Sequence, residues 1–259
     1  MFRLATYVAG AMALALLPAA AQVREVLHTD IEKDGAEVEF MNGLTLSDVQ
    51  PGDEQSAHEL AFSYAPFDWW KPIVALEIAN PRGANAEVEA FEFGNVFLLT
   101  GGGHDHHDHA GGDHSGGDLH SALALFAGFE LPNAAGLNEA ALEFGPLLEL
   151  SAGPWLGIGN LLVDIPLEDG VDPGLGYALS VSYAVSRKVR LGMEAYGTMD
   201  ELFGSSAGFA RQEHSIGPAA YFSFDLGYGR ILEPRVALLS GYTGAGPDMM
   251  LSLNVELKF

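Results

Sequence analysis

The chain has 259 residues and no cysteine, and its 35 acidic residues outnumber 12 lysines and arginines, giving a formal net charge of −23 at pH 7. So large a negative surplus repels phosphate backbones, and we therefore expect no nucleic-acid partner. Without cysteine the fold contains no disulfides, and any bound metal must be held by His, Asp or Glu.

Residues 1–21 predict a secretory signal peptide. Arg3 precedes an apolar run over residues 4–17, and small residues at 19–21 end it. A helix that spans a bilayer needs about 20 apolar residues, so this run is too short, whereas small residues suit a signal peptidase. We expect export and a mature protein of residues 22–259. A buried N-terminal helix is the alternative.

The mature chain consists of short segments in which apolar and polar side chains alternate. Leu60, Phe62 and Tyr64, for example, alternate with Glu59 and Ser63. A period of two is typical of strands and would not occur on a helix. Clusters of Gly, Pro, Asn and Asp separate the segments. They delimit twelve strands, near residues 36–46, 56–66, 70–80, 85–100, 120–131, 138–151, 154–166, 174–186, 188–198, 214–226, 229–241 and 248–259.

The strand pattern predicts an all-β fold, an antiparallel transmembrane β-barrel of about twelve strands. Every apolar stretch after the signal peptide is broken by a charge, Gly or Pro, so we expect no transmembrane helix. The short turns near 151–154, 186–188 and 226–229 alternate with longer loops and fall on the periplasmic side if both termini are periplasmic. Trp69 and Trp70 fall at another turn of that side, as an aromatic girdle would, although core packing in a soluble protein is the alternative.

Alternation assigns many acids to the lumen and few bases. The bases are chiefly Arg190, Arg235 and Lys258. The acids are Glu37, Glu39, Glu59, Glu77, Glu89, Glu143, Glu149, Glu194 and Glu256. A water-filled lumen of this kind would favour cations. The alternative is a plugged interior in which the acids pair with bases and neutral polar groups.

Residues 101–120 form a His-rich segment, which joins the fourth and fifth predicted strands. Its sequence, GGGHDHHDHAGGDHSGGDLH, contains six histidines, four aspartates and seven glycines. So polar and glycine-rich a tract cannot bury a core and predicts a flexible loop. The candidate metal ligands are His104, Asp105, His106, His107, Asp108, His109, Asp113, His114, Asp118 and His120.

Imidazole and carboxylate suit divalent transition metals, and copper(II) should bind more tightly than nickel or zinc. The spacing fixes no single geometry, so we expect several sites of moderate affinity. The position between an even and an odd strand predicts a periplasmic loop, which favours buffering or gating over capture from the medium. A solvated linker that binds no metal is the alternative.

The last predicted strand ends in a C-terminal aromatic residue. Leu253, Leu257 and Phe259 lie on one face, and Asn254 and Glu256 lie on the other. Such a strand resembles the closing strand of bacterial outer-membrane proteins, which implies recognition of the segment ending in Phe259 by the barrel-assembly machinery. We therefore expect outer-membrane lipid and that machinery as partners.

Several segments together resemble a family of uncharacterised proteobacterial outer-membrane barrels. They read HELAFSY at 58–64, DWWK at 68–71, FEFGNVFLLT at 91–100, LEFGPLL at 142–148 and HSIGP at 214–218. The resemblance covers most of the mature chain, and the family is similar in layout to barrels attributed to copper resistance and to uptake of hydrophobic compounds. It implies the fold and the outer-membrane location but no catalytic residues. The His-rich segment replaces an expected short turn, so its function cannot be inherited.

We therefore expect an outer-membrane pore or transport protein with a metal-binding loop, no obligatory cofactor and no enzymatic activity. The nearest candidate for catalysis, His214 beside Ser215, fails because adjacent strand residues point to opposite faces. Two alternatives stay open. One is a non-conducting barrel that sequesters metal, and the other is a barrel for hydrophobic compounds in which the loop is incidental.

Overall fold

The computed structural model describes residues 25–46, 54–81, 85–101, 119–132, 140–168, 170–199, 212–243 and 247–259, so the predicted signal peptide lies outside it. In these ranges no helix is long and apolar enough to cross a membrane. The strands are β1 (Ala36–Thr45), β2 (Glu54–Tyr64), β3 (Trp70–Pro81), β4 (Glu87–Thr100), β5 (Leu119–Pro132), β6 (Ala141–Ala152), β7 (Trp155–Pro166), β8 (Gly174–Ser186), β9 (Val189–Met199), β10 (Glu213–Phe222), β11 (Phe224–Gly227), β12 (Arg230–Gly241) and β13 (Met249–Lys258).

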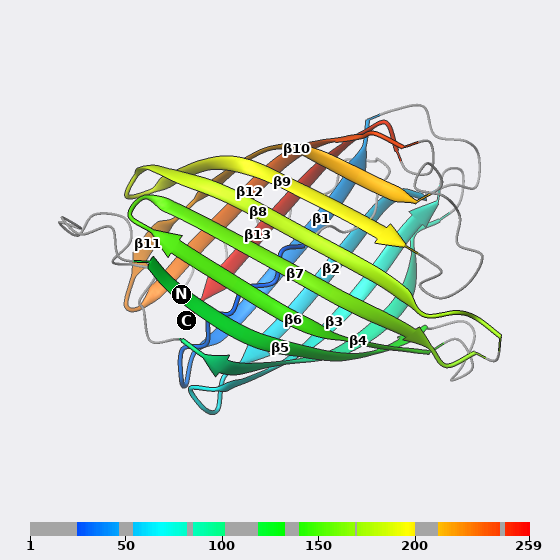
Figure 1. Cartoon of the computed structure of the whole chain (residues 1–259), viewed down its shortest axis with the longest axis horizontal. Coiled ribbons are helices and arrows are strands. Elements are labelled where there is room, and N and C mark those ends of the chain that lie inside the picture. The colour runs from blue at the N-terminus through cyan, green and yellow to red at the C-terminus, as the bar shows by residue number, and fades with distance from the viewer. Residues whose placement is uncertain are drawn as a thin grey trace.

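These strands form a single closed antiparallel barrel (Figure 1). Consecutive strands pair from β1 to β10, and β1 also pairs with β13, which brings Glu37 beside Lys258. Both β10 and β11 pair with β12, so they form one strand that is interrupted at Ser223. Counted in this way, the barrel has twelve strands, as predicted, and the break at Ser223 lies inside one predicted strand.

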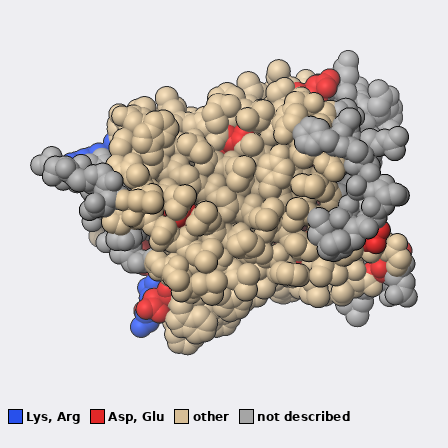
Figure 2. Space-filling model, viewed as in Figure 1, with Lys and Arg blue, Asp and Glu red and all other residues tan. Residues whose placement is uncertain are grey.

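The outer wall is apolar and the inner wall is largely polar. On β2, Leu60 and Phe62 are exposed, whereas Glu59, Ala61 and Ser63 are buried. Exposed apolar side chains recur around the barrel, and Figure 2 shows few charged residues on the middle of the face in view. So large an apolar surface is unfavourable in water and favourable in contact with lipid. A closed barrel also pairs its backbone groups between strands, as the interior of a membrane requires. The barrel therefore spans a membrane.

The two ends of the barrel differ in the length of their connections. Two-residue connections join β6 to β7, β8 to β9 and β11 to β12, and they lie at the end that holds Phe259. Phe67 and Trp69 also lie at this end, where their exposed rings stack 5.6 Å apart. Trp155 and Tyr183 meet edge to face there at 5.0 Å. These rings agree with the predicted aromatic girdle and with the predicted alternation of turns.

Two Gly-Pro pairs of the sequence have the same structural role. In the β6–β7 ladder Phe144 is opposite Val163 and Leu147 is opposite Asn160, so the ladder is interrupted at Gly145 and Pro146. A Cβ atom on Gly145 would lie 1.9 Å from the backbone oxygen of Leu161. Only glycine permits this approach, and proline has no N–H to leave unpaired. Gly217 and Pro218 interrupt the β10–β12 ladder in the same way.

Candidate functional site in the barrel lumen

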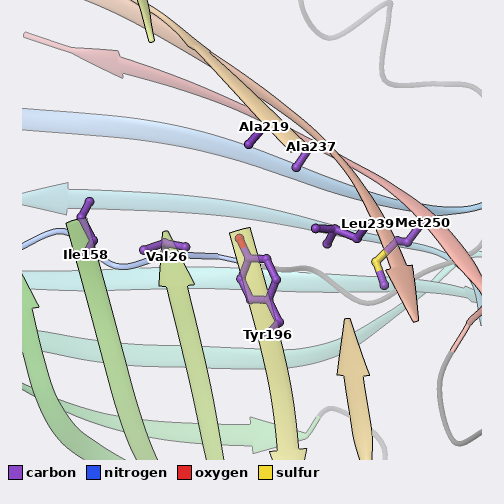
Figure 3. Packing of buried hydrophobic residues seen from close by; sticks show 7 residues of the cluster. All are labelled: Val26, Ile158, Tyr196, Ala219, Ala237, Leu239 and Met250. Carbon is purple, nitrogen blue, oxygen red and sulfur yellow. The ribbon is translucent and has the colours of Figure 1, made fainter. Parts of the chain in front are cut away.

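Residues 25–35, the N-terminal segment, run inside the barrel before β1 begins. Val26 and Ile31 are buried, at 8% and 9% exposure. Figure 3 shows Val26 among inward-facing side chains of β7, β9, β10, β12 and β13, which include Ile158 and Tyr196. Ile31 packs with Phe126 and other residues of the opposite wall. The segment therefore crosses the lumen and contacts both walls, an arrangement that the alternation pattern did not predict.

Polar contacts hold the N-terminal segment to the wall. The side-chain amide of Asn160 on β7 donates to the backbone oxygen of Leu27 at 2.9 Å and accepts from its N–H at 2.7 Å. The side-chain amide thus pairs with the backbone of Leu27 as the backbone of a neighbouring strand would. Thr29 donates to Glu149 at 3.2 Å, and Lys258 lies 3.5 Å from Asp30. Because these partners belong to β6, β7 and β13, the segment is fixed from several sides.

One carboxylate from each of seven consecutive strands lines the lumen, and we call this set the acidic band. Its members are Glu39 (β1), Glu59 (β2), Glu77 (β3), Glu92 (β4), Glu130 (β5), Glu143 (β6) and Asp164 (β7). Six of them face one another as direct cross-strand pairs: Glu59 with Glu77, Glu92 with Glu130, and Glu143 with Asp164. Like charges directly opposite one another destabilise a sheet. The repulsion within each pair must therefore be relieved, either by protonation or by a positive charge.

The acidic band is continuous along the wall. Glu92 is opposite Ala75, two residues from Glu77, so the two carboxylates are diagonal neighbours. Glu143 is likewise diagonal to Glu130, and Glu39 is diagonal to Glu59. Diagonal neighbours in a sheet are about 7–8 Å apart, and direct neighbours about 5 Å. Successive carboxylates thus follow one another at close intervals over seven strands.

Three of the lumenal bases, Lys71, Arg235 and Lys258, form ion pairs with acids outside the acidic band. Lys71 donates to Glu37 at 2.9 Å, and Lys258 lies 3.1 Å from Glu233. Glu59 is 7% exposed and lines a small cavity. Glu59 is therefore a largely buried carboxylate to which no described residue donates a hydrogen bond.

The opposite arc contains a mixed-charge network of Arg235, Glu194, Tyr196 and Tyr221. Arg235 donates through Nε to one oxygen of Glu194 at 2.6 Å and through Nη2 to the other. The hydroxyls of Tyr196 and Tyr221 donate to the same carboxylate at 2.8 and 2.6 Å. A planar guanidinium and two hydroxyls together meet both carboxylate oxygens. Burial of this charge is thus compensated inside the protein.

Two cavities flank the N-terminal segment. A cavity of about 50 Å³ is lined by Glu25 of the segment and by Glu59 and Glu92 of the acidic band. Burial and the neighbouring carboxylates, Glu39 first among them, raise the pKa of Glu25 well above its usual range. A larger cavity of about 730 Å³ lies toward the turns, where Arg190 and Lys258 line it. The segment therefore places an acid of its own against the acidic band.

Arg190 differs from the other lumenal bases because its hydrogen bonds are with neutral groups. It donates to the hydroxyl of Ser182 at 3.0 Å and to the backbone oxygen of Pro154 at 3.0 Å. Both partners lie near the turn end of the barrel. Arg190 therefore lies where the lumen meets the short turns, at the same end of the barrel as the exposed aromatic rings described above.

Nine of the ten predicted metal ligands lie outside the described residues. They are His104, Asp105, His106, His107, Asp108, His109, Asp113, His114 and Asp118. The tenth, His120, is exposed near the start of β5. Gly101 and Leu119 flank the undescribed part at the end of the barrel that holds Phe259. Elsewhere in the described chain, no three His, Cys, Asp or Glu residues gather closely enough to hold a metal ion.

Eight of the nine predicted lumenal glutamates line the interior, and Glu89 does not. Glu89 is exposed and lies at an irregularity where Ala90 pairs with Glu77 but Val88 pairs with Ile78. Counted back from the outward-facing Phe91 and Phe93, alternation places Glu89 on the outer face, so the prediction misassigned this residue. Conversely, three members of the acidic band were missed: Glu92, Glu130 and Asp164. The sequence contained a signal for Glu92, which lies between the outward-facing Phe91 and Phe93.

No protein-family model matches the chain, and no curated protein matches its sequence. Solved structures do match. The COG4313 outer membrane channel from Pseudomonas putida F1 aligns with a TM-score of 0.60 at 11% identity, over 92% of this chain and 100% of that one. The NanC porin aligns with a TM-score of 0.49 at 9% identity, over 86% and 98%. A KdgM porin in complex with disordered oligogalacturonate gives 0.46 at 9% identity, over 86% and 98%.

The similarity to the COG4313 channel confirms the predicted fold, a closed twelve-stranded barrel of the outer-membrane type. This fold agrees with the predicted location in the outer membrane. The matched structures named here are channels and porins. Because no family model matches, the resemblance to an uncharacterised proteobacterial family stays a prediction.

Proposed function

We propose that the chain is an outer-membrane channel for cations and that the N-terminal segment closes it in the conformation described here. The acidic band carries this proposal. A row of carboxylates attracts cations and repels anions, and the effect is stronger in a narrow lumen with low-dielectric walls than in open water. The seven carboxylates extend over β1 to β7, so a cation entering from either end would meet them.

We further propose that the His-rich segment binds divalent transition metals and thereby buffers or gates the channel from the periplasmic side. Its ligands would be the histidines and aspartates between His104 and His120. Support comes from its composition and from the position of its flanking residues, Gly101 and Leu119, at the end with the short turns. Short turns are periplasmic in barrels of this kind. Acidification would release the metal, because each imidazole must be neutral to bind.

A non-conducting barrel that sequesters metal is the second candidate, and the anchored N-terminal segment favours it. The two hydrogen bonds between Asn160 and Leu27 would have to break before the segment could leave the lumen. A barrel for hydrophobic compounds has less support, because a carboxylate-lined wall would oppose the entry of an apolar solute.

Reversal potentials across planar bilayers test the proposal. The refolded mature protein would be recorded in a potassium chloride gradient, together with an Asn160→Ala variant that weakens the anchoring of the N-terminal segment. We expect cation-selective current steps, larger or more frequent in the variant. Anion selectivity, or silence of both proteins after verified insertion, would reject a cation channel.

Metal dependence requires a separate recording. Micromolar copper(II) added on the side of the turns should reduce the current of the full chain and leave a variant lacking residues 102–118 unchanged. Equal responses of the two proteins would reject a regulatory function for the His-rich segment without affecting the cation channel itself.

A further inference from the structure

The geometry of the acidic band does not suit a single metal ion. Calcium takes six to eight oxygen ligands at about 2.3–2.6 Å, which requires side chains that converge on one point. The carboxylates of the acidic band instead follow one another along the wall at intervals of about 5–8 Å. In the described part of the chain, no three potential metal ligands come together. The arrangement is a line of charges and not a cage.

Glu59 indicates that part of the acidic band lacks a compensating positive charge. Its side chain is more than nine-tenths buried, it faces Glu77 across the strands, and within the described residues it accepts no hydrogen bond. An unpaired buried carboxylate is costly, and a ligand that supplied a cationic donor would offset the cost. Glu59 lines the 50 Å³ cavity together with Glu39 and Glu92, so such a donor would contact the acidic band there.

Apolar side chains lie directly beside these carboxylates. Ile73, Val96 and Phe126 line the same cavity as Glu59. A hydrated inorganic cation gains nothing from such neighbours. The methylene groups of an alkyl chain, by contrast, would leave water on contact with them, which is favourable. The wall of this cavity thus combines carboxylates with apolar surface.

We infer that the acidic band binds linear polyamines, whose ammonium groups pair with carboxylates of successive strands while the methylenes between them contact Ile73, Val96 and Phe126. The inference rests on the proposed cation channel and names the class of cation. The 50 Å³ cavity holds a single ammonium group while the N-terminal segment is in place. A longer ligand therefore displaces Glu25 from the acidic band as it binds.

Calorimetric titration of the refolded full chain in detergent tests this inference. The probes are spermidine, putrescine, butylamine and magnesium at equal ionic strength. We expect affinity to fall from spermidine to putrescine to butylamine, with magnesium weaker than spermidine. The double variant Glu59→Gln with Glu77→Gln should bind spermidine about tenfold more weakly, because charge-assisted hydrogen bonds are lost. Equal affinity for spermidine and butylamine, or no effect of the double variant, would overturn the inference.

Two controls keep the result interpretable. Glu87→Gln removes an exposed carboxylate from the same strand as Glu92 and should leave spermidine binding unchanged. Heat-dependent migration in gels reports whether each variant is a folded barrel. If the double variant does not fold, Glu92→Gln replaces it, with the same expected direction.

Failure of the inference and failure of the proposed channel give different results. Cation-selective conductance without a preference for spermidine over butylamine would reject polyamine binding and leave the channel intact. Binding of spermidine that depends on Glu59, combined with silent bilayers even for Asn160→Ala, would reject the channel and leave the binding site.

Discussion

Buried charge is compensated on one arc of the lumen, formed by β9, β10 and β12, and is not compensated in the same way on the other, formed by β1 to β7. On β9, β10 and β12, Glu194 is surrounded by Arg235 and two tyrosine hydroxyls, and its side chain is 0% exposed. On β1 to β7, carboxylates face carboxylates, and Glu59 has no polar partner among the described residues. The first arc is thus arranged for stability. The second accepts a cost in stability, as functional sites commonly do.

Removal of Arg235 should have the largest effect on stability. Arg235→Met leaves the carboxylate of Glu194 buried without its guanidinium, which costs about 3–5 kcal/mol. Urea unfolding of the refolded barrel, followed by tryptophan fluorescence, measures the loss. Arg235→Lys keeps the charge and should lose less. A change below about 1 kcal/mol for Arg235→Met would show that the mixed-charge network is not what compensates Glu194.

Removal of the Asn160 side-chain amide should have the next largest effect, and on the N-terminal segment alone. Asn160→Ala breaks two hydrogen bonds with Leu27, worth together about 1–3 kcal/mol. The fraction of time spent conducting should rise about tenfold, while unfolding by urea changes little. Asn95→Ala is the matched control, because this amide bonds Trp70 and Ala127 on the wall and does not contact the segment. An equal rise in both variants would contradict the anchoring role of Asn160.

Alkaline pH should loosen the N-terminal segment by a smaller amount. The pKa of Glu25 is raised in the seated segment, because burial and the charges of Glu39, Glu59 and Glu92 oppose its ionisation, and Lys71 offsets them only in part. The seated conformation is therefore favoured while Glu25 is protonated and loses stability as the pH rises through the raised pKa. Open probability should increase with pH, and Glu25→Gln should flatten the increase. A profile that is unchanged in this variant would assign the dependence to other groups.

Neutralising one member of a carboxylate pair should have the smallest effect, with the opposite sign to that of Arg235→Met. Glu143→Gln relieves repulsion with Asp164 directly across the strands and should raise the free energy of unfolding by about 0.2–1 kcal/mol. Urea unfolding at neutral pH measures it. Glu194→Gln provides the contrast, since its neutralisation should lower stability. A loss of stability in Glu143→Gln would mean that the acidic band is compensated within the barrel.

Alternation along single strands was sufficient to predict the barrel, its strand number and most of the lumenal acids. Alternation is sufficient because successive side chains of every strand point alternately to the lipid and to the lumen. Local pattern was insufficient wherever the backbone departs from regularity. The pairing of β3 with β4 is irregular near Glu89, and Ser223 divides one predicted strand into two.

The position of the N-terminal segment inside the lumen could not be predicted from sequence pattern, for a different reason. Its defining contact joins Leu27 to Asn160, 133 residues later, and nothing in either local sequence specifies the other. The acidic band was predicted only in part: Glu39, Glu59, Glu77 and Glu143 were assigned to the lumen and the other three members were missed. The cross-strand pairing of the carboxylates depends on register, which local pattern does not specify. The metal ligands of the His-rich segment, and recognition of Phe259 by the barrel-assembly machinery, stay predictions.

The enclosure of the N-terminal segment has a consequence for the order of folding. These residues leave the ribosome before any strand, yet their partners include Asn160 on β7 and Lys258 at the end of β13. The pairing of β1 with β13 joins the first strand to the last, so the cylinder closes only when the whole chain has been delivered. Contacts so distant in sequence form slowly. The N-terminal segment, which precedes every strand, is therefore enclosed only when β13 pairs with β1.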